Sequence, residues 1–396
     1  MHKDRSYYSV AKDLNMLPFF SVYLDLLRII ACAAVYIGHN GLPWLLGINR
    51  FEDYYSIGHD AVVVFFVLSG YVVAYAAHSI EKTPKNYIIN RVARILPPAI
   101  AAILVSYFLM RMAYIFFPEA YTQPQQLKMP WHYALSSLVF INQNWWNEFV
   151  PFSNSPYWSL SYEVWYYALF FCLNFIKGTK RIGFFLLILL ASGPKIAILA
   201  PAWFLGTAAY FWRDRWTLNK FWASFLFVLS LVIYAVLKVS GIQITQYSAA
   251  YHYIGQPVEE FMHHGLGGAA AFAWDYVLAF LIAMHLYAAR FLSSLRFLET
   301  SFLSKTIKKI AGYTYSAYIF HMPLNRFFAA VMNGAQSIHD IDTYRIALQI
   351  GVLPTIIVLA NMTEHQKKPV RVFLLWLTTR FTAWGTPARL WFKLRG

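Results

Sequence analysis

An arginine and a histidine share one face of the first long apolar segment, which reads LDLLRIIACAAVYIGHN. Arg28 and His39 lie eleven positions apart. Eleven residues of an α-helix make about three turns and rise roughly 16 Å. Ionisable side chains inside membrane-spanning helices are costly and tend to mark a site or a pathway. We therefore predict that His39 is a general base near one membrane surface. The alternative is an interfacial histidine above an arginine used for packing.

Asp25 lies one turn below Arg28 and is predicted to pair with it. In this interpretation the pair is a fixed charge that orients the site and contacts the substrate. The alternative is that the pair only stabilises helix packing.

The second apolar segment contains GHDAVVVFFVLSGY over residues 58–71. Ser69 and Gly70 are small, and small residues let helix backbones approach closely. Alternatively, with the two phenylalanines before them, they shape a slot for an acyl chain. His59 and Asp60 lie at the outer end of this segment and could bind substrate in the same outer pocket as the predicted base.

Two arginines follow in RVARILP, residues 91–97, at the cytoplasmic mouth of the third segment. Arg91 and Arg94 are three positions apart and lie on one helix face. Their position favours ordinary positive-inside anchors. The functional alternative is a fork of guanidiniums that binds the phosphates of a coenzyme A thioester by bidentate hydrogen bonds.

A carboxylate lies within the next apolar segment, which begins YWSLSYEVWYY at residue 157. Glu163 needs a partner at this depth, and the arginine or histidine of the first segment are candidates. Trp158 and Tyr162 beside it could form an aromatic belt at the interface or contact a sugar acceptor.

A further histidine lies in YTYSAYIFHMP, residues 313–323. Packing of His321 against tyrosines favours a structural role, and substrate binding is the functional alternative. His263 and His264 are adjacent but have no third ligand nearby, so no metal site is predicted.

Apolar helices must position these residues. The chain has 396 residues, of which 59% are hydrophobic and 13% charged, against about 25% charged in soluble domains. Its apolar runs approach the ~20 residues that cross a bilayer core. We predict an all-α, polytopic bundle of about ten spans, with approximate cores at 18–38, 57–79, 95–117, 157–176, 182–199, 200–212, 221–239, 268–289, 310–331 and 345–363.

The charge pattern predicts the orientation of this bundle. The net charge is +15, and basic residues gather in alternate loops as the positive-inside rule requires. No nucleic-acid partner is needed to explain it. Both termini are predicted to be cytoplasmic. Residues 1–364 are predicted to form the transmembrane domain and residues 365–396 a basic tail at the membrane interface.

In this order, the segments LDLLRIIACAAVYIGH, GHDAVVVFFVLSGY, RVARILPP, WSLSYEVWYY and YTYSAYIFHMPL resemble the acyltransferase-3 family of integral-membrane acyltransferases. The matching pieces are spread over almost the whole chain. Members of that family move acyl groups, commonly acetyl, from cytoplasmic acyl-CoA to hydroxyls on extracytoplasmic acceptors, many of them glycans.

The resemblance implies roles for particular residues. It implies that Arg28 and His39 are the central functional pair. It also implies that Arg91 and Arg94 help to bind the acyl donor and that Glu163 contributes to the site. It implies an O-acyltransferase of the multi-pass bacterial inner membrane that uses acyl-CoA, without a metal, on a glycan or lipid-linked saccharide. This mechanism needs a passage from the mouth at Arg91 to His39.

Two other functional classes are alternatives to this expectation. A transporter or flippase for a lipid-linked saccharide would also use intramembrane Arg, His and Glu. Inverted repeats would favour it, and the sequence has none that we detect. A scaffold protein would leave the co-facial Arg28 and His39 unexplained.

Overall fold

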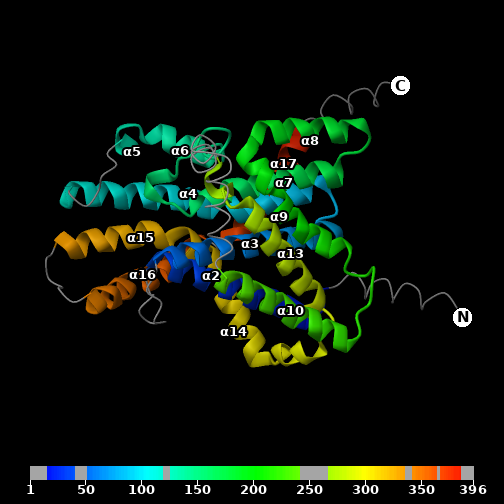
Figure 1. The fold of residues 1–396 in the computed structure, drawn as a ribbon. Helices are drawn as coiled ribbons and strands as arrows, with labels where there is room; N and C mark the ends of the chain where they lie inside the picture. The colour runs from blue at the N-terminus through cyan, green and yellow to red at the C-terminus, as the bar shows by residue number, and fades with distance from the viewer. Residues whose placement is uncertain are drawn as a thin grey trace, which may run out of the picture.

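The computed structural model describes residues 16–40, 51–118, 125–240, 266–334, 341–363 and 366–384. Within these ranges the chain forms helices and no strand, which confirms the all-α prediction (Figure 1). The α-helices are α2 (Pro18–Asn40), α3 (Phe51–Ser79), α4 (Pro84–Phe116), α5 (Gln125–Lys128), α6 (Pro130–Leu138), α7 (Tyr157–Phe175), α8 (Thr179–Ser192), α9 (Pro194–Phe211), α10 (Lys220–Val239), α13 (Phe272–Ala289), α14 (Ser301–Ala311), α15 (Thr314–Gly334), α16 (Ile341–Thr363) and α17 (Lys367–Trp384). Short 3₁₀ turns, η3 (Pro151–Ser153), η5 (Gly267–Ala269) and η6 (Ser293–Glu299), join some of them.

Five helical stretches among the described residues are long and apolar enough to cross a membrane, namely Pro18–His39, Ile57–Ser79, Pro84–Phe116, Lys220–Val239 and Phe272–Ala289. The chain is thus an integral membrane protein. The larger count of about ten spans, the cytoplasmic termini and the division at residue 364 remain predictions.

Two local expectations are refined by the helix bounds. Helix α4 begins at Pro84, ahead of the third span predicted at 95–117. Thr83 caps it by accepting a hydrogen bond from the backbone N–H of Asn86 at 3.2 Å, so both arginines of the predicted fork lie on helix. The boundary predicted between the spans 182–199 and 200–212 is wrong, because α8 ends before Gly193, whose φ is +85°, and α9 continues through Leu199 and Ala200 to Phe211. That φ lies in the left-handed region that glycine adopts easily.

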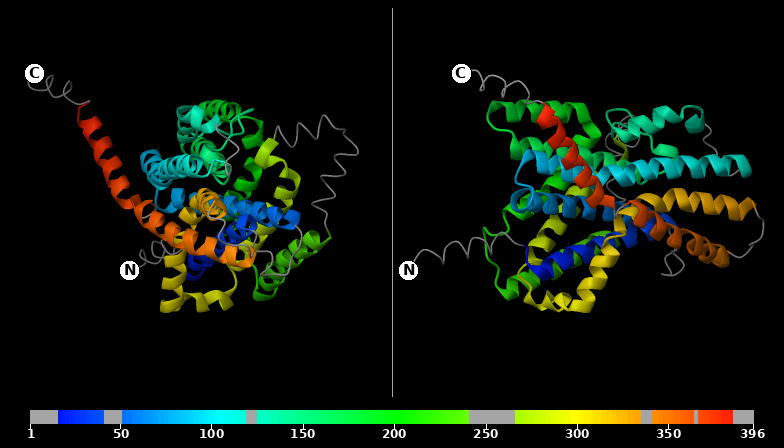
Figure 2. Two further views of the ribbon diagram at one scale, coloured as in Figure 1. Left: turned by 90° about the vertical axis from the view of Figure 1, so that its left-hand side faces the viewer. Right: turned by 180° about the vertical axis from the view of Figure 1, so that it is seen from behind.

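Helices α2, α3 and α9 form the centre of the bundle, with α3 packed against both of the others. Helix α2 also contacts α14 and α15, which follow it late in the sequence (Figure 1). Helix α17 contacts α4, and its far end stands away from the other helices (Figure 2). The contacts of α2 therefore bring the first charged residues against segments almost 300 positions later in the chain.

Glycine makes the contact between α3 and α9 possible. A Cβ atom at Gly70 would lie 2.2 Å from the carbonyl oxygen of Trp203, and one at Gly206 would lie 2.0 Å from that of Val67. The backbones therefore touch at this crossing, which is the close approach expected from small residues.

Replacing Gly70 by alanine is predicted to lower the midpoint of thermal unfolding, because the added methyl group must push the α9 backbone away. We expect a loss of about 1–3 kcal/mol. Gly183→Ala on α8 is the matched control, since nothing lies within 4 Å of its Cβ position. An equal loss in both variants would contradict the backbone contact.

Candidate functional site

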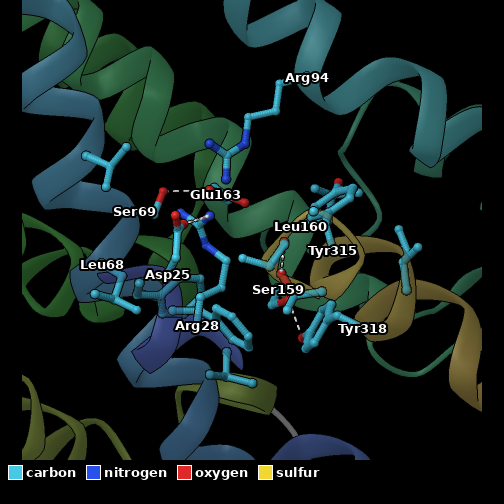
Figure 3. Close-up of a pocket in the computed structure, with 18 of the residues that line it drawn as sticks. Asp25, Arg28, Leu68, Ser69, Arg94, Ser159, Leu160, Glu163, Tyr315 and Tyr318 are labelled. Atoms are coloured by element: carbon cyan, nitrogen blue, oxygen red, sulfur yellow. Dashed lines mark hydrogen bonds and ion pairs between the residues drawn. The ribbon is translucent and has the colours of Figure 1, made fainter. Parts of the chain in front are cut away.

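A cavity of about 300 Å³ lies where α2, α3, α4, α7, α14 and α15 meet (Figure 3). Helices α2 and α7 each contribute a carboxylate to its wall, and α2, α4 and α14 contribute cations. These charged lining residues are Asp25, Arg28, Arg94, Glu163 and Lys308. With three cationic and two anionic side chains, the formal charge of the lining is positive by one.

Glu163 is the centre of this charged group. Ser69 Oγ donates to its Oε1 at 2.6 Å, and the Tyr167 hydroxyl donates to the same oxygen at 2.5 Å. Figure 3 shows Arg28 and Arg94 extending toward Glu163 from different sides. Two hydroxyl donors on one oxygen hold the carboxylate in one orientation. The sequence offered Arg28 or His39 as the partner of this carboxylate; Arg28 lines the same cavity as Glu163, whereas His39 is not among the lining residues.

The predicted pairing of Asp25 with Arg28 is confirmed. Asp25 Oδ1 lies 3.1 Å from Arg28 Nη1, one helical turn apart on α2. Both side chains line the cavity and keep about a fifth to a quarter of their surface exposed, 22% and 24% respectively. Arg28 can therefore contact a ligand while Asp25 restrains it.

The two arginines of the predicted fork have different surroundings. Arg91 Nη2 lies 2.6 Å from Glu81 Oε1, and its guanidinium lies over the rings of Tyr87 and Tyr167 at 5.6 and 5.3 Å from their centroids. Only 9% of Arg91 is exposed. Arg94 instead lines the cavity. Donor binding by the pair remains a prediction, and Arg94 is the member of the pair that lines the cavity.

Ser69 and Gly70, the small residues of α3, also have different surroundings. Ser69 lines the cavity and holds Glu163, whereas the Cβ position of Gly70 faces the α9 backbone. The expectation that both contact the donor stays untested.

His39 lies in the last turn of α2 and is exposed. It is not among the residues that line the cavity. Its Nδ1 lies 3.1 Å from Nε2 of His321 on α15, and the ring centroids are 5.1 Å apart. The structure thus brings together two histidines that the sequence separates by 282 positions.

Tyr318 stands between the cavity and the histidine pair. Its ring forms part of the cavity wall and lies 6.4 Å from the His321 ring, centroid to centroid. Its hydroxyl is 2.5 Å from Ser159 Oγ and donates to the Pro156 carbonyl at 3.2 Å. Phe65 packs edge-on against it at 5.7 Å. Tyr318 thus lines the cavity on one side and neighbours His321, and the passage to His39 remains a prediction.

His59 and Asp60 belong to a second polar cluster, between α3, α10 and α13. His59 Nε2 lies 2.8 Å from Asp275 Oδ1. Asp60 accepts hydrogen bonds from Trp274, Lys238 and Tyr234, at 2.7, 2.5 and 2.9 Å. This cluster ties three helices together and contributes no residue to the cavity lining.

The predicted acceptor-binding aromatics lie beside that cluster. The Trp158 ring stacks on His59 with an interplanar angle of 9° at 6.3 Å, and it meets Tyr162 edge-on at 5.0 Å. Their contact with an acceptor stays a prediction. His263 and His264 lie outside the described residues.

Several cavity residues were missed by sequence reasoning. Lys308, which the sequence analysis does not single out, lines the cavity from α14. Tyr315 and Tyr318 line it from α15. Their three-residue spacing in YTYSAYIFHMP places them on one helix face, a signal that the sequence contains.

The Arg91–Glu81 pair is predicted to be stabilising as a unit. Arg91→Gln should lower the free energy of unfolding by about 3–5 kcal/mol, because it leaves the buried Glu81 carboxylate uncompensated. Chemical denaturation of the double variant Glu81→Gln/Arg91→Gln should give a smaller loss. A double variant as unstable as the single one would contradict the pairing.

Comparison with known proteins gives one match. The family model described as an acyltransferase domain, that of the acyltransferase-3 family, matches residues 21–361 and so spans every residue of the cavity lining. Neither the curated proteins nor the solved structures gave a match. The match favours acyl transfer over the transporter alternative.

Proposed function

Because the chain belongs to the acyltransferase-3 family, we propose that it is an O-acyltransferase of the bacterial inner membrane. The acyl group, most simply acetyl, passes from cytoplasmic acyl-CoA to a hydroxyl of an extracytoplasmic glycan or lipid-linked saccharide. The observation that carries the proposal is the cavity in which Arg28 and Arg94 converge on Glu163.

The donor enters from the end that the charge pattern places in the cytoplasm. Lys308 lies in the basic stretch 290–309, and Lys305 and Lys309 beside it are exposed. Phosphate groups of coenzyme A suit these amines and the Arg94 guanidinium. A volume of about 300 Å³ is at the lower end of the range for small-ligand sites, roughly 300–1,000 Å³. It suits the acyl-pantetheine arm, with the nucleotide remaining at the mouth.

The chemistry follows from where charge develops. The acceptor hydroxyl oxygen bonds to the thioester carbonyl carbon, and negative charge grows on the carbonyl oxygen. Arg28 and Arg94 are cations in a largely apolar cavity and stabilise that charge. Glu163, held by Ser69 and Tyr167, restrains the two guanidiniums. The carbon–sulfur bond then breaks and coenzyme A leaves as its thiolate.

His39 takes the proton of the acceptor hydroxyl. Since Tyr318 separates the cavity from His39 in this conformation, transfer includes a step in which the ring of Tyr318 moves or the acyl group passes it. Direct attack by the hydroxyl and an acyl group carried briefly on His39 both fit this order.

Isolated membranes with radiolabelled acetyl-CoA provide the test. Label should reach extractable glycan with the native chain and fall about 100-fold or more with His39→Ala, because a positioned base contributes that much. His78→Ala is the control. His78 lies on α3, and its ring forms a hydrogen bond of 3.1 Å with the Ala74 carbonyl. Undiminished transfer by His39→Ala would remove His39 from catalysis, and absence of transfer with any acyl-CoA would contradict the function.

The donor contact is tested by Arg94→Lys. Lysine keeps the charge but loses the planar fork, so we expect the KM for acyl-CoA to rise about tenfold while the amount of inserted protein stays normal. Arg111→Lys, an exposed position on the same helix, serves as the matched control. An unchanged KM for Arg94→Lys would return Arg94 to the role of a membrane anchor.

A further inference from the structure

The hydrogen bonds of His321 define which of its nitrogens carries a hydrogen. His321 is fully buried, with 0% of its surface exposed. Its Nδ1 lies 3.0 and 2.8 Å from the carbonyl oxygens of Ala317 and Tyr318. A carbonyl oxygen only accepts hydrogen bonds, so Nδ1 must be the donor. A neutral imidazole has one N–H, which leaves Nε2 of His321 as an acceptor.

The same logic extends to His39. Nε2 of His321 lies 3.1 Å from Nδ1 of His39, and two bare nitrogens would form no hydrogen bond. Nδ1 of His39 therefore carries the hydrogen, and the lone pair of its Nε2 is available to take a proton. A doubly protonated His321 would reverse the direction of this hydrogen bond, with Nε2 of His321 as the donor. Such a His321 would be a cation with no exposed surface, held by two carbonyl oxygens and a neutral ring. Burial of such a charge is costly.

We propose that His321 is a positioning residue that sets the tautomer and the orientation of His39. The proposal rests on the proposed acyltransferase function, in which His39 is the base. A base held by a third group is a common arrangement in nucleophilic and acyl-transfer sites. When Nε2 of His39 gains the hydroxyl proton, its Nδ1–H bond to His321 becomes charge-assisted and stabilises the imidazolium.

The backbone of α15 fixes the first ring in this series of hydrogen bonds. The carbonyls of Ala317 and Tyr318 lie one turn before His321, so the helix itself orients the His321 ring. Tyr36 packs against the same ring at 5.8 Å between centroids. Because α2 and α15 each contribute one histidine, the hydrogen-bonded pair forms only where α2 packs against α15.

Nitrogen-15 NMR of the full-length protein in lipid bilayers, labelled at histidine, reads the tautomer without turnover. Signals of His39 and His321 are assigned from His39→Ala and His321→Ala. We expect neutral His39 with hydrogen on Nδ1 in the wild type, and a mixture of tautomers in His321→Ala. Hydrogen on Nε2 of His39 in the neutral wild type would overturn the proposal.

Kinetics of the same variants test the consequence. His321→Ala should lower kcat about 10- to 100-fold with the KM for acetyl-CoA unchanged. His321→Gln should recover part of kcat, since its side-chain oxygen accepts the Nδ1–H bond. His285→Ala is the matched control: His285 is buried on α13 and bonded to Tyr23 and Ser230 at 2.5 and 2.8 Å, away from the cavity lining.

The outcomes separate the two proposals. An unchanged kcat per folded molecule in His321→Ala, or an equal loss in His285→Ala, would overturn the positioning role of His321. Wild-type protein that transfers no acyl group from any acyl-CoA would overturn the acyltransferase function itself, even where NMR places the hydrogen on Nδ1 of His39.

Discussion

A carboxylate held among cations inside an apolar helix bundle is the constraint on which the rest of this structure depends. Glu163 has Ser69 and Tyr167 as donors on one oxygen, and Arg28 and Arg94 extend toward it. Glu163 and the two arginines are half-buried, so removing one partner leaves a charge with weaker compensation. The helices that carry these residues, α2, α3, α4 and α7, are therefore restrained together, and the cavity that they enclose keeps its cationic lining.

This arrangement divides the proposed reaction between two levels of the membrane. The cationic cavity lies at the predicted cytoplasmic level, where Arg94 and Lys308 line it. The His39–His321 pair lies at the outer end of α2. Helix α15 contributes to both places, since Tyr318 lines the cavity and His321 follows it one turn later. Movement of one aromatic side chain could then connect a donor from inside with an acceptor from outside.

Much of the fold could be predicted because the local hydropathy of a sequence identifies the helices of a membrane protein. The apolar runs predicted an all-α chain, and Asp25 and Arg28, three positions apart, predicted their ion pair. What local sequence could not predict is the set of contacts between distant helices. The partner of His39 is 282 positions away. Arg91 and Arg94 are alike in sequence, but Arg91 pairs with Glu81 and Arg94 lines the cavity. Lys308 was missed for the same reason: its contribution depends on how α14 meets α2.

The most direct measurement of the central claim is an electron cryomicroscopy structure of the protein in lipid with a non-hydrolysable acyl-CoA analogue. We predict that the carbonyl of the analogue lies between Arg28 and Arg94, the pantetheine arm in the cavity and the phosphates at Lys308. An analogue bound elsewhere, with the cavity filled by side chains, would contradict it.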